Sequence, residues 1–230
     1  MSVVLIISAP SGSGKSTLAR RLIETDSHLD FSTSVTTRQP RRGDEEGKSY
    51  RFVSEVDFLA MRDRNELLEW ARVFGNYYGT SKDVLDSARQ RGHDLLLDID
   101  VQGAASLMKR LPEAVTVFIL PPSPGELENR LRNRSSDSNE VIEYRLREAA
   151  QEVANYGDYN YVLINDQIDE TAEQLRSILV AERCRQQRMA GRTETVDQLR
   201  SIRIAERCRQ RRMAERIEPI VESFQAGTRI

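Results

Sequence analysis

Short apolar runs alternate with amphipathic segments along the first two thirds of the chain. The apolar runs occupy residues 3–7, 31–36, 95–99, 115–120 and 161–164. Three of them are almost continuously hydrophobic, which is typical of parallel strands covered on both faces. Helical patterns lie between and after them, at 15–25, 82–91, 101–110, 124–133 and 139–155. This alternation predicts an α/β fold around a mostly parallel, five-stranded core sheet with right-handed crossovers.

Two stretches do not follow the alternation of strands and helices. Residues 37–81 are polar and rich in Arg, Gly and Tyr, whereas residues 121–150 open with "PPSPG" and are rich in Arg and Glu. We expect both to be insertions that lie over the carboxyl ends of the core strands. Ligands bind at those ends in open α/β sheets.

The C-terminal part of the chain carries a tandem repeat. Residues 171–194 and 195–218 are identical at 17 of 24 aligned positions, which indicates a duplicated helix segment. We expect Gly191 to separate the copies and Pro219 to end or kink the second. In one unbroken helix, a 24-residue shift is about two thirds of a turn, so the copies could not bury the same face. A longer helix, a helical hairpin and a subunit interface, and with it a homo-oligomer, all remain open.

Charge and composition narrow the range of partners. The 230 residues include 34 basic and 36 acidic ones, so the formal net charge of -2 predicts no general attraction to nucleic acid or membrane. No apolar run is long enough to cross a bilayer, and the first is too short for a secretory core. Residues 174–216 contain twelve arginines and five acidic residues. No aromatic residue lies between the arginines to stack on bases, so we favour an exposed helical face over nucleic-acid binding.

The two cysteines occupy matching positions in the repeat. Cys184 and Cys208 are better explained as copies of one ancestral residue than as a disulfide pair. A chain with so few cysteines fits a reducing compartment. We therefore expect a cytoplasmic protein.

The segment "SAPSGSGKST" (residues 8–17) joins the first predicted strand to the first predicted helix. A strand that feeds a tight loop into a helix directs several backbone N–H groups at one small volume, which suits a phosphate. Gly12 and Gly14 permit backbone conformations that a side chain forbids and let phosphate oxygens come close. Lys15 adds a mobile positive charge for the β- and γ-phosphates of a nucleotide, and Ser16 offers a hydroxyl to Mg2+.

The usual form of this loop is G-x-x-x-x-G-K-[S/T], and this chain has Ala9 in place of the first glycine. A residue of such small size still fits, and strand, loop, "GKS" and helix occur in the required order. We therefore predict a P-loop NTPase fold that binds a nucleoside triphosphate together with Mg2+. The residues expected to bind the nucleotide are Ala9, Pro10, Ser11, Gly12, Ser13, Gly14, Lys15, Ser16 and Thr17.

An acidic partner for the loop is expected at the end of a neighbouring strand. "LLLDID" supplies Asp98 and Asp100, which face the same side if the strand is extended. One of them could hold Mg2+ through water while the other orients a basic residue. We predict Ser16 and Asp98 as the metal-binding residues.

Four further motifs make the chain resemble one family. They are "STSVTTRQPRRGDEEGKSYRF" (32–52), Glu69-Trp70, "NYYGT" (76–80) and "DIDVQG" (98–103). Together they closely resemble guanylate kinase over most of residues 3–190. The resemblance implies a nucleoside monophosphate kinase of purine metabolism, which transfers the γ-phosphate of ATP to GMP. It implies one domain over 1–230, with a core (1–31, 82–120, 151–190), a GMP-binding insert (32–81) and a lid (121–150), followed by the repeat.

The resemblance also assigns roles to individual residues. A nucleoside monophosphate brings about two negative charges, which favour guanidinium donors, and guanine presents two N–H donors that a carboxylate can accept. The residues implied to bind GMP are Ser34, Arg38, Arg41, Tyr50, Glu69, Tyr78, Thr80, Asp98 and Asp100. Lys15, Arg38 and the lid arginines Arg134 and Arg145 are implied to be catalytic, with Arg130 a further match. Asn165, in "INDQ", matches a segment near the adenine base.

Two alternative functions remain open from the sequence. Guanylate-kinase-like domains also occur as non-catalytic interaction modules, which typically lack an intact phosphate loop, whereas Gly14, Lys15 and Ser16 are all present here. A kinase of another phosphorylated acceptor, such as a ribose bisphosphate, would not need the set of Glu69, Ser34 and Thr80 that favours a guanine base.

Overall fold

The computed structural model describes residues 2–40, 44–47, 50–73, 75–134, 138–189 and 195–227, with only the backbone at 134, 187–189 and 227. Its centre is a five-stranded, fully parallel sheet in the order β2-β7-β1-β8-β9. The strands are β1 (Val4–Ser8), β2 (Leu29–Phe31), β7 (Asp94–Asp98), β8 (Val115–Leu120) and β9 (Tyr161–Ile164). The predicted α/β fold with a five-stranded parallel core is confirmed.

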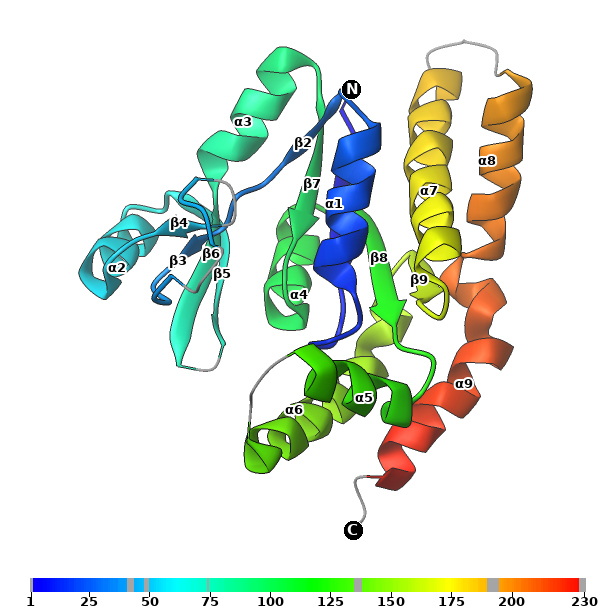
Figure 1. Cartoon of the computed structure of the whole chain (residues 1–230). Helices are drawn as coiled ribbons and strands as arrows, with labels where there is room; N and C mark the ends of the chain where they lie inside the picture. Colours follow the sequence, from blue (N-terminus) through cyan, green and yellow to red (C-terminus); the bar gives the residue numbers. More distant parts are fainter. Residues whose placement is uncertain are drawn as a thin grey trace.

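Successive side chains of β1 point to opposite faces of the core sheet, as the two-residue period of a strand requires. Val4 and Ile6 pack toward one face of the sheet, while Leu5 and Ile7 pack toward the other. The first face is covered by α3 (Lys82–Arg91), α4 (Val101–Arg110), α5 (Pro124–Arg134), α6 (Asn139–Glu152), the 3-10 turn η1 (Val153–Asp158) and α9 (Gln210–Gly227). The second face is covered by α1 (Lys15–Thr25) and α7 (Ile168–Met189) (Figure 1).

A second, smaller sheet lies beside the core sheet (Figure 1). Its order is β4-β3-β6-β5, and its strands are β3 (Val35–Thr36), β4 (Arg51–Phe52), β5 (Leu67–Val73) and β6 (Asn76–Ser81). Helix α2 (Glu55–Asp63) packs Phe58 and Met61 against it. All these elements except β3 lie within residues 37–81, the stretch that departed from the strand–helix alternation.

The predicted strand over residues 31–36 is wrong as a single element. Phe31 ends β2 in the core sheet, and Val35 begins β3 in the second sheet. Between them the chain is still tied to the core, because Ser32 N–H donates to the Leu96 carbonyl at 2.9 Å. The alternating apolar pattern indicates extended backbone, but it does not identify which sheet each half joins.

The C-terminal repeat forms a helical hairpin. Helix α7 holds most of the first copy, and α8 (Val196–Arg207) runs back along it before α9 turns under the sheet (Figure 1). The expectation for one unbroken helix does not apply, because the copies lie on separate helices. Matching residues are buried to different extents at some positions and alike at others: Leu175 is fully buried and its counterpart Leu199 half exposed, whereas Cys184 and Cys208 are both buried. Gly191 lies outside the described residues. The expectation that Pro219 ends the second copy is wrong, because α9 continues through it, held on both sides by buried Ile217 and Val221.

Among the described residues, no helix is both long enough and apolar enough to cross a membrane.

Candidate active site

The phosphate loop lies at the carboxyl end of β1, the central strand of the core sheet. Gly12 and Gly14 have φ angles of +91° and +90°, a region that other residues rarely enter. Ser13 N–H donates to the Pro10 carbonyl at 3.1 Å, which closes the turn, and α1 starts directly at Lys15. Helix α5 packs against the loop, because a Cβ on Gly12 would lie 2.9 Å from Leu127 Cδ1. The loop therefore has the conformation that the sequence motif predicted.

Lys15 bridges the loop to the neighbouring strand β7. Its Nζ lies 2.6 Å from Asp98 Oδ1 and donates to the Ile99 carbonyl at 2.6 Å. Burial by itself would lower the pKa of Lys15, but the Asp98 carboxylate outweighs it, so the net shift is upward. The ammonium group is therefore charged at neutral pH and already positioned at the edge where a phosphate would bind.

Asp98 and Asp100 do not share one extended strand, contrary to the sequence prediction. Strand β7 ends at Asp98, and Asp100 is the N-cap of α4, where its Oδ1 accepts from Gln102 N–H at 2.8 Å and Gly103 N–H at 2.9 Å. An acidic N-cap satisfies the free amides at a helix start. Both carboxylates still act on Lys15, since each raises its pKa.

Glu69 is the most deeply buried of the predicted acidic site residues, with 3% of its surface exposed. Its Oε1 accepts a hydrogen bond from Thr80 Oγ1 at 2.7 Å across the β5–β6 pair. On its other side, a Cβ on Gly103 would lie 2.6 Å from Glu69 Oε2, so only glycine leaves room there. Burial raises the pKa of Glu69 to about 7, and Asp100 adds to the rise while the Thr80 hydrogen bond opposes it.

A cluster of one arginine and two tyrosines lies toward the β3–β4 side of the second sheet. Arg38 lies 5.1 Å above the Tyr50 ring and donates from Nη2 to Asp44 Oδ2 at 2.9 Å. The Tyr50 and Tyr78 rings are 5.9 Å apart. Burial would lower the pKa of Arg38, and Asp44 raises it above its usual value. A guanidinium and two phenol groups thus gather as a phosphate site requires.

The Lys15–Asp98 pair and the cluster of Arg38, Tyr50 and Tyr78 lie within electrostatic range of one another. Burial is the main cause of the raised pKa of Tyr50, and Asp98 raises it further while Lys15 lowers it. Asp100 acts on Lys15 and on Glu69 alike. The phosphate loop and the second sheet therefore contribute to one continuous site.

The remaining predicted residues are placed less fully. Ser34 lies just before β3, and its carbonyl accepts from Arg51 N–H at 2.9 Å. Arg145 is half-buried on α6. Arg134 ends α5, but its side chain, like the whole of Arg41, lies outside the described residues. Arg130 donates to Glu126 at 2.8 Å and to the Asn165 carbonyl at 3.0 Å.

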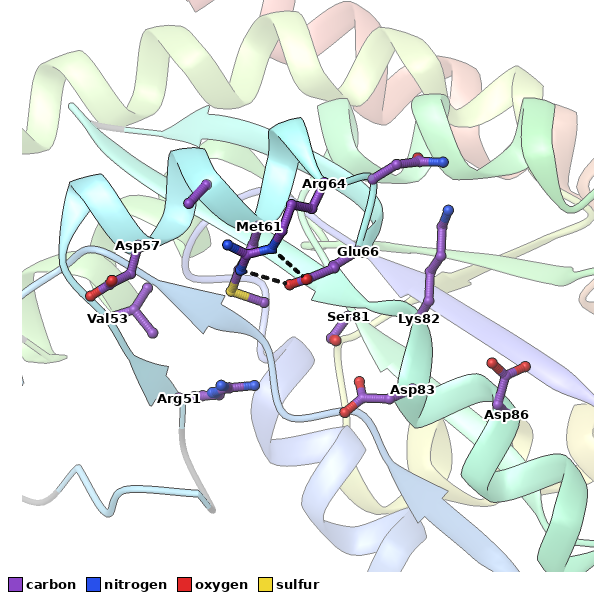
Figure 2. Close-up of a pocket in the computed structure, with 12 residues that line it drawn as sticks. Arg51, Val53, Asp57, Met61, Arg64, Glu66, Ser81, Lys82, Asp83 and Asp86 are labelled. Carbon is purple, nitrogen blue, oxygen red and sulfur yellow. Dashed lines mark hydrogen bonds and ion pairs between the residues drawn. The ribbon is translucent and has the colours of Figure 1, made fainter.

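A groove beside the second sheet lies away from these residues. It lies between α2, the end of β6 and the start of α3 (Figure 2), and has a volume of about 670 Å³. Its described lining mixes both charges and includes none of the predicted site residues. Arg64 and Glu66 pair with each other in this lining, at 2.6 and 3.3 Å (Figure 2). Their charges already compensate one another, so this groove lacks the excess of positive charge that a phosphate site needs.

Three residues of the site were not assigned a role from the sequence. Asp44 orients Arg38, Gly103 provides clearance for Glu69, and Glu152 lies close enough to feel Asp100 and Lys15. Burial raises the pKa of Glu152 to about 7, with Asp100 raising it further. Asp44 and Gly103 fall inside the quoted motifs and could have been noticed there. Glu152 has no local signal, because only the packing of α6 brings it to the loop.

The fold and the site together define a class of protein. A parallel sheet whose central strand feeds a glycine loop, a lysine and a helix, with an aspartate on the adjacent strand, is the arrangement of P-loop phosphotransferases. The cluster of Arg38, Tyr50 and Tyr78 lies close enough to this loop to influence its charges.

Comparisons with known proteins identify the family within that class. The family model described as guanylate kinase matches residues 1–182. A guanylate kinase of Geobacter metallireducens is 51% identical over 183 residues, which cover 80% of this chain and 90% of that protein. A guanylate kinase of Agrobacterium fabrum is 46% identical over 190 residues, covering 82% of this chain and 86% of the relative.

A solved structure agrees with these matches. The crystal structure of guanylate kinase from Anaplasma phagocytophilum has a TM-score of 0.67 and 39% sequence identity, and covers 79% of this chain and 86% of that one. The chain belongs to the guanylate kinase family, whose members are nucleoside monophosphate kinases that transfer phosphate from ATP to GMP. Helices α8 and α9 lie beyond the part that the family model matches.

Proposed function

We propose that this chain binds ATP at the phosphate loop and GMP over the second sheet, and that the described residues transfer the γ-phosphate between them. The observation that carries the proposal is the buried, hydrogen-bonded pair of Glu69 and Thr80. Asp100 links this pair to the phosphate loop, because it raises the pKa of both Glu69 and Lys15. A buried carboxylate can accept the N1–H and 2-amino hydrogens of guanine. Adenine lacks both donors, and it would leave the carboxylate unpaired, which is costly in a buried site.

On the donor side, the loop from Ala9 to Thr17 supplies backbone amides and Lys15 supplies a charge. In the free protein Lys15 is paired with Asp98 at 2.6 Å. Triphosphate would compete for the same ammonium group, so ATP binding shifts Lys15 from Asp98 toward the β- and γ-phosphates. The pairing keeps both charges compensated until the substrate arrives.

On the acceptor side, Arg38 is the described cation, with Tyr50 and Tyr78 as hydroxyl donors. We infer that GMP phosphate displaces Asp44 from Arg38, with Arg41 as a second cation and Ser34 beside the base. The attacking phosphate oxygen is already ionised, so no general base is needed. These residues orient the acceptor for an in-line attack, which is a large part of what such a kinase supplies.

The residues present fit a magnesium ion. Mg2+ in phosphotransferases takes one or two protein ligands and completes its shell with phosphates and water. Ser16 and Asp98 supply that number, and the described part of the chain holds no group of three or more metal-ligating side chains. When bound, the ion neutralises charge that develops on the transferring phosphate. Arg134 and Arg145, on the proposed lid, would add to this and exclude water.

The direct test is to mix purified protein with MgATP and GMP and to measure ADP and GDP. A matched pair of variants, Lys15→Met and Lys82→Met, separates the loop lysine from a lysine at the start of α3. We expect turnover to fall by at least about a thousandfold in the first and to persist in the second. A protein that makes no GDP would be an interaction module. Preference for AMP or a ribose bisphosphate in an acceptor panel would identify another kinase.

We also propose that the protein works in the cytoplasm. Cys184 and Cys208 are both free and buried, which fits a reducing compartment. Mass measurement in solution will establish whether it forms a homo-oligomer.

A further inference from the structure

Asn165 is the first residue after β9, and the protein holds three of its four polar groups, while the buried side-chain Oδ1 has no hydrogen-bond partner among the described residues. Its N–H donates to the Leu120 carbonyl at 2.8 Å, and its carbonyl accepts from Arg130 Nη2 at 3.0 Å. Its side-chain Nδ2 donates to the carbonyl of Ser13, in the phosphate loop, at 2.7 Å. Only 2% of the residue is exposed. Asn165 therefore acts as a rigid link between the end of the sheet and the loop.

The direction of this side-chain amide is fixed by chemistry. If the amide were reversed, Oδ1 would face the Ser13 carbonyl, and two acceptors would meet without a hydrogen. The donor must therefore point at the loop. The asparagine is a second reason for the glycine that follows Ser13, besides its φ of +90°, because a Cβ on Gly14 would lie 2.4 Å from Nδ2.

The bond has a consequence on the far side of the loop peptide. The Ser13 carbonyl and the Gly14 N–H belong to one planar trans peptide group, so they point in opposite directions. When Asn165 holds the carbonyl, the Gly14 N–H is turned away from Asn165. Gly14 also keeps its own carbonyl on Leu18 N–H at 3.1 Å, which fixes the next peptide at the start of α1. The side chain thus sets the orientation of one amide in the phosphate-binding turn.

We propose that Asn165 is a positioning residue for the donor phosphates: it acts through the Ser13–Gly14 peptide to aim the Gly14 N–H. This rests on the proposed ATP site in the phosphate loop. Loss of a hydrogen bond to a charged group weakens binding about tenfold or more.

The test uses inorganic tripolyphosphate, a ligand with phosphates and no base. Dissociation constants for tripolyphosphate, ATP and GMP are measured by calorimetry for the full chain, for Asn165→Ala and for the equally shaped Asn165→Asp. The control is Asn160→Ala, at the opposite end of β9, where Asn160 Oδ1 accepts from Thr116 N–H at 2.9 Å. We expect both Asn165 variants to bind tripolyphosphate and ATP about tenfold or more weakly, to bind GMP within about twofold of the parent, and to raise KM for ATP but not for GMP.

Three results would overturn the proposal. A loss confined to ATP, with tripolyphosphate unchanged, would show that Asn165 contacts the base. Equal loss of GMP affinity in both variants, or failure of both to fold, would show a general structural role. An equal effect of Asn160→Ala would show that any weakening of β9 suffices. The outcome is independent of the acceptor: if the parent protein fails to phosphorylate GMP but its tripolyphosphate affinity still depends on Asn165, the positioning role stands and the GMP kinase assignment falls.

Discussion

Replacing Glu69 with glutamine tests the central feature of the acceptor site. The carboxyl group has a pKa of 4.5 in an unfolded chain and about 7 in the folded protein, because burial disfavours its charge. A carboxyl pKa that is raised by folding contributes stability at low pH, and this stability is lost as the pH rises through the folded value. For this one group the free energy of unfolding should fall by about 2.5 kcal/mol between pH 5 and pH 8.

The assay is urea unfolding of the parent protein and of Glu69→Gln at several pH values between 5 and 8. Glutamine keeps an acceptor for Thr80 and carries no charge, so the difference in stability between variant and parent should move by about 2.5 kcal/mol in favour of the variant across that range. The control is Glu66→Gln, since Glu66 is exposed and Arg64 lowers its pKa. That variant should show no such gain as the pH rises. Parallel pH profiles for Glu69→Gln and the parent would refute the reasoning.

The same variant should bind GMP poorly. Glutamine presents one acceptor and one donor to the two donors of guanine, so we expect GMP affinity to fall roughly 10- to 150-fold while ATP affinity is kept. In the parent protein, GMP affinity should rise from pH 6 to pH 8 as Glu69 loses its proton. Calorimetry with GMP and with ATP measures both effects. A GMP affinity that stays constant across that pH range would mean that the charge of Glu69 has no part in recognition.

Further predictions concern clearance, stability and the repeat. Gly103→Ala places a methyl group against Glu69, so KM for GMP should rise about tenfold with the ATP dissociation constant unchanged; equal KM values would contradict the contact. Arg183 makes two ion pairs, both at 2.5 Å, that tie α7 to the end of α1 and to β7. Arg183→Met should therefore lower the free energy of unfolding in urea by about 2 kcal/mol. Arg207→Met, at the exposed counterpart in the second copy, should change it little. Deleting residues 186–209 removes one repeat unit and leaves "AERCRQRRM" intact across the junction, so turnover and cooperative unfolding should both survive; loss of either would show that α8 supports the enzyme.

The acceptor and donor sites differ in how far the sequence could predict them. The phosphate loop is local, and its glycines, lysine and helix start could all be predicted from ten consecutive residues. The acceptor site brings Glu69, Thr80 and Gly103 together from three separate elements. Residue chemistry alone left Glu69 as an ordinary surface residue, and only the resemblance of its motif gave it a role. Its burial and raised pKa depend on the packing of β5 against β6 and α4.

Asn165 shows the same limit at the scale of one side chain. The sequence placed it at a strand end, and it is indeed the first residue after β9. Its hydrogen bond to Ser13 joins residues 152 positions apart, and no periodic pattern reports such a contact. The sequence also indicated extended backbone over 31–36 without showing that the chain leaves one sheet for another.

The repeat separates the two kinds of information most directly. The sequence by itself determined the order of strands and helices in the core, the phosphate loop and the existence of a duplicated segment, because these depend on neighbouring residues and on periodicity. Yet "AERCRQ" occurs twice with two structures: residues 181–186 lie within the unbroken helix α7, whereas the helix breaks at Cys208 and Arg209 in the second copy. There the Cys208 carbonyl accepts from Val162 N–H at 2.9 Å, and Gln210 N–H donates to Asn160, which covers the free edge of β9. Identical residues adopt different backbones because an exposed strand edge offers one copy the hydrogen bonds that the other finds only within its own helix.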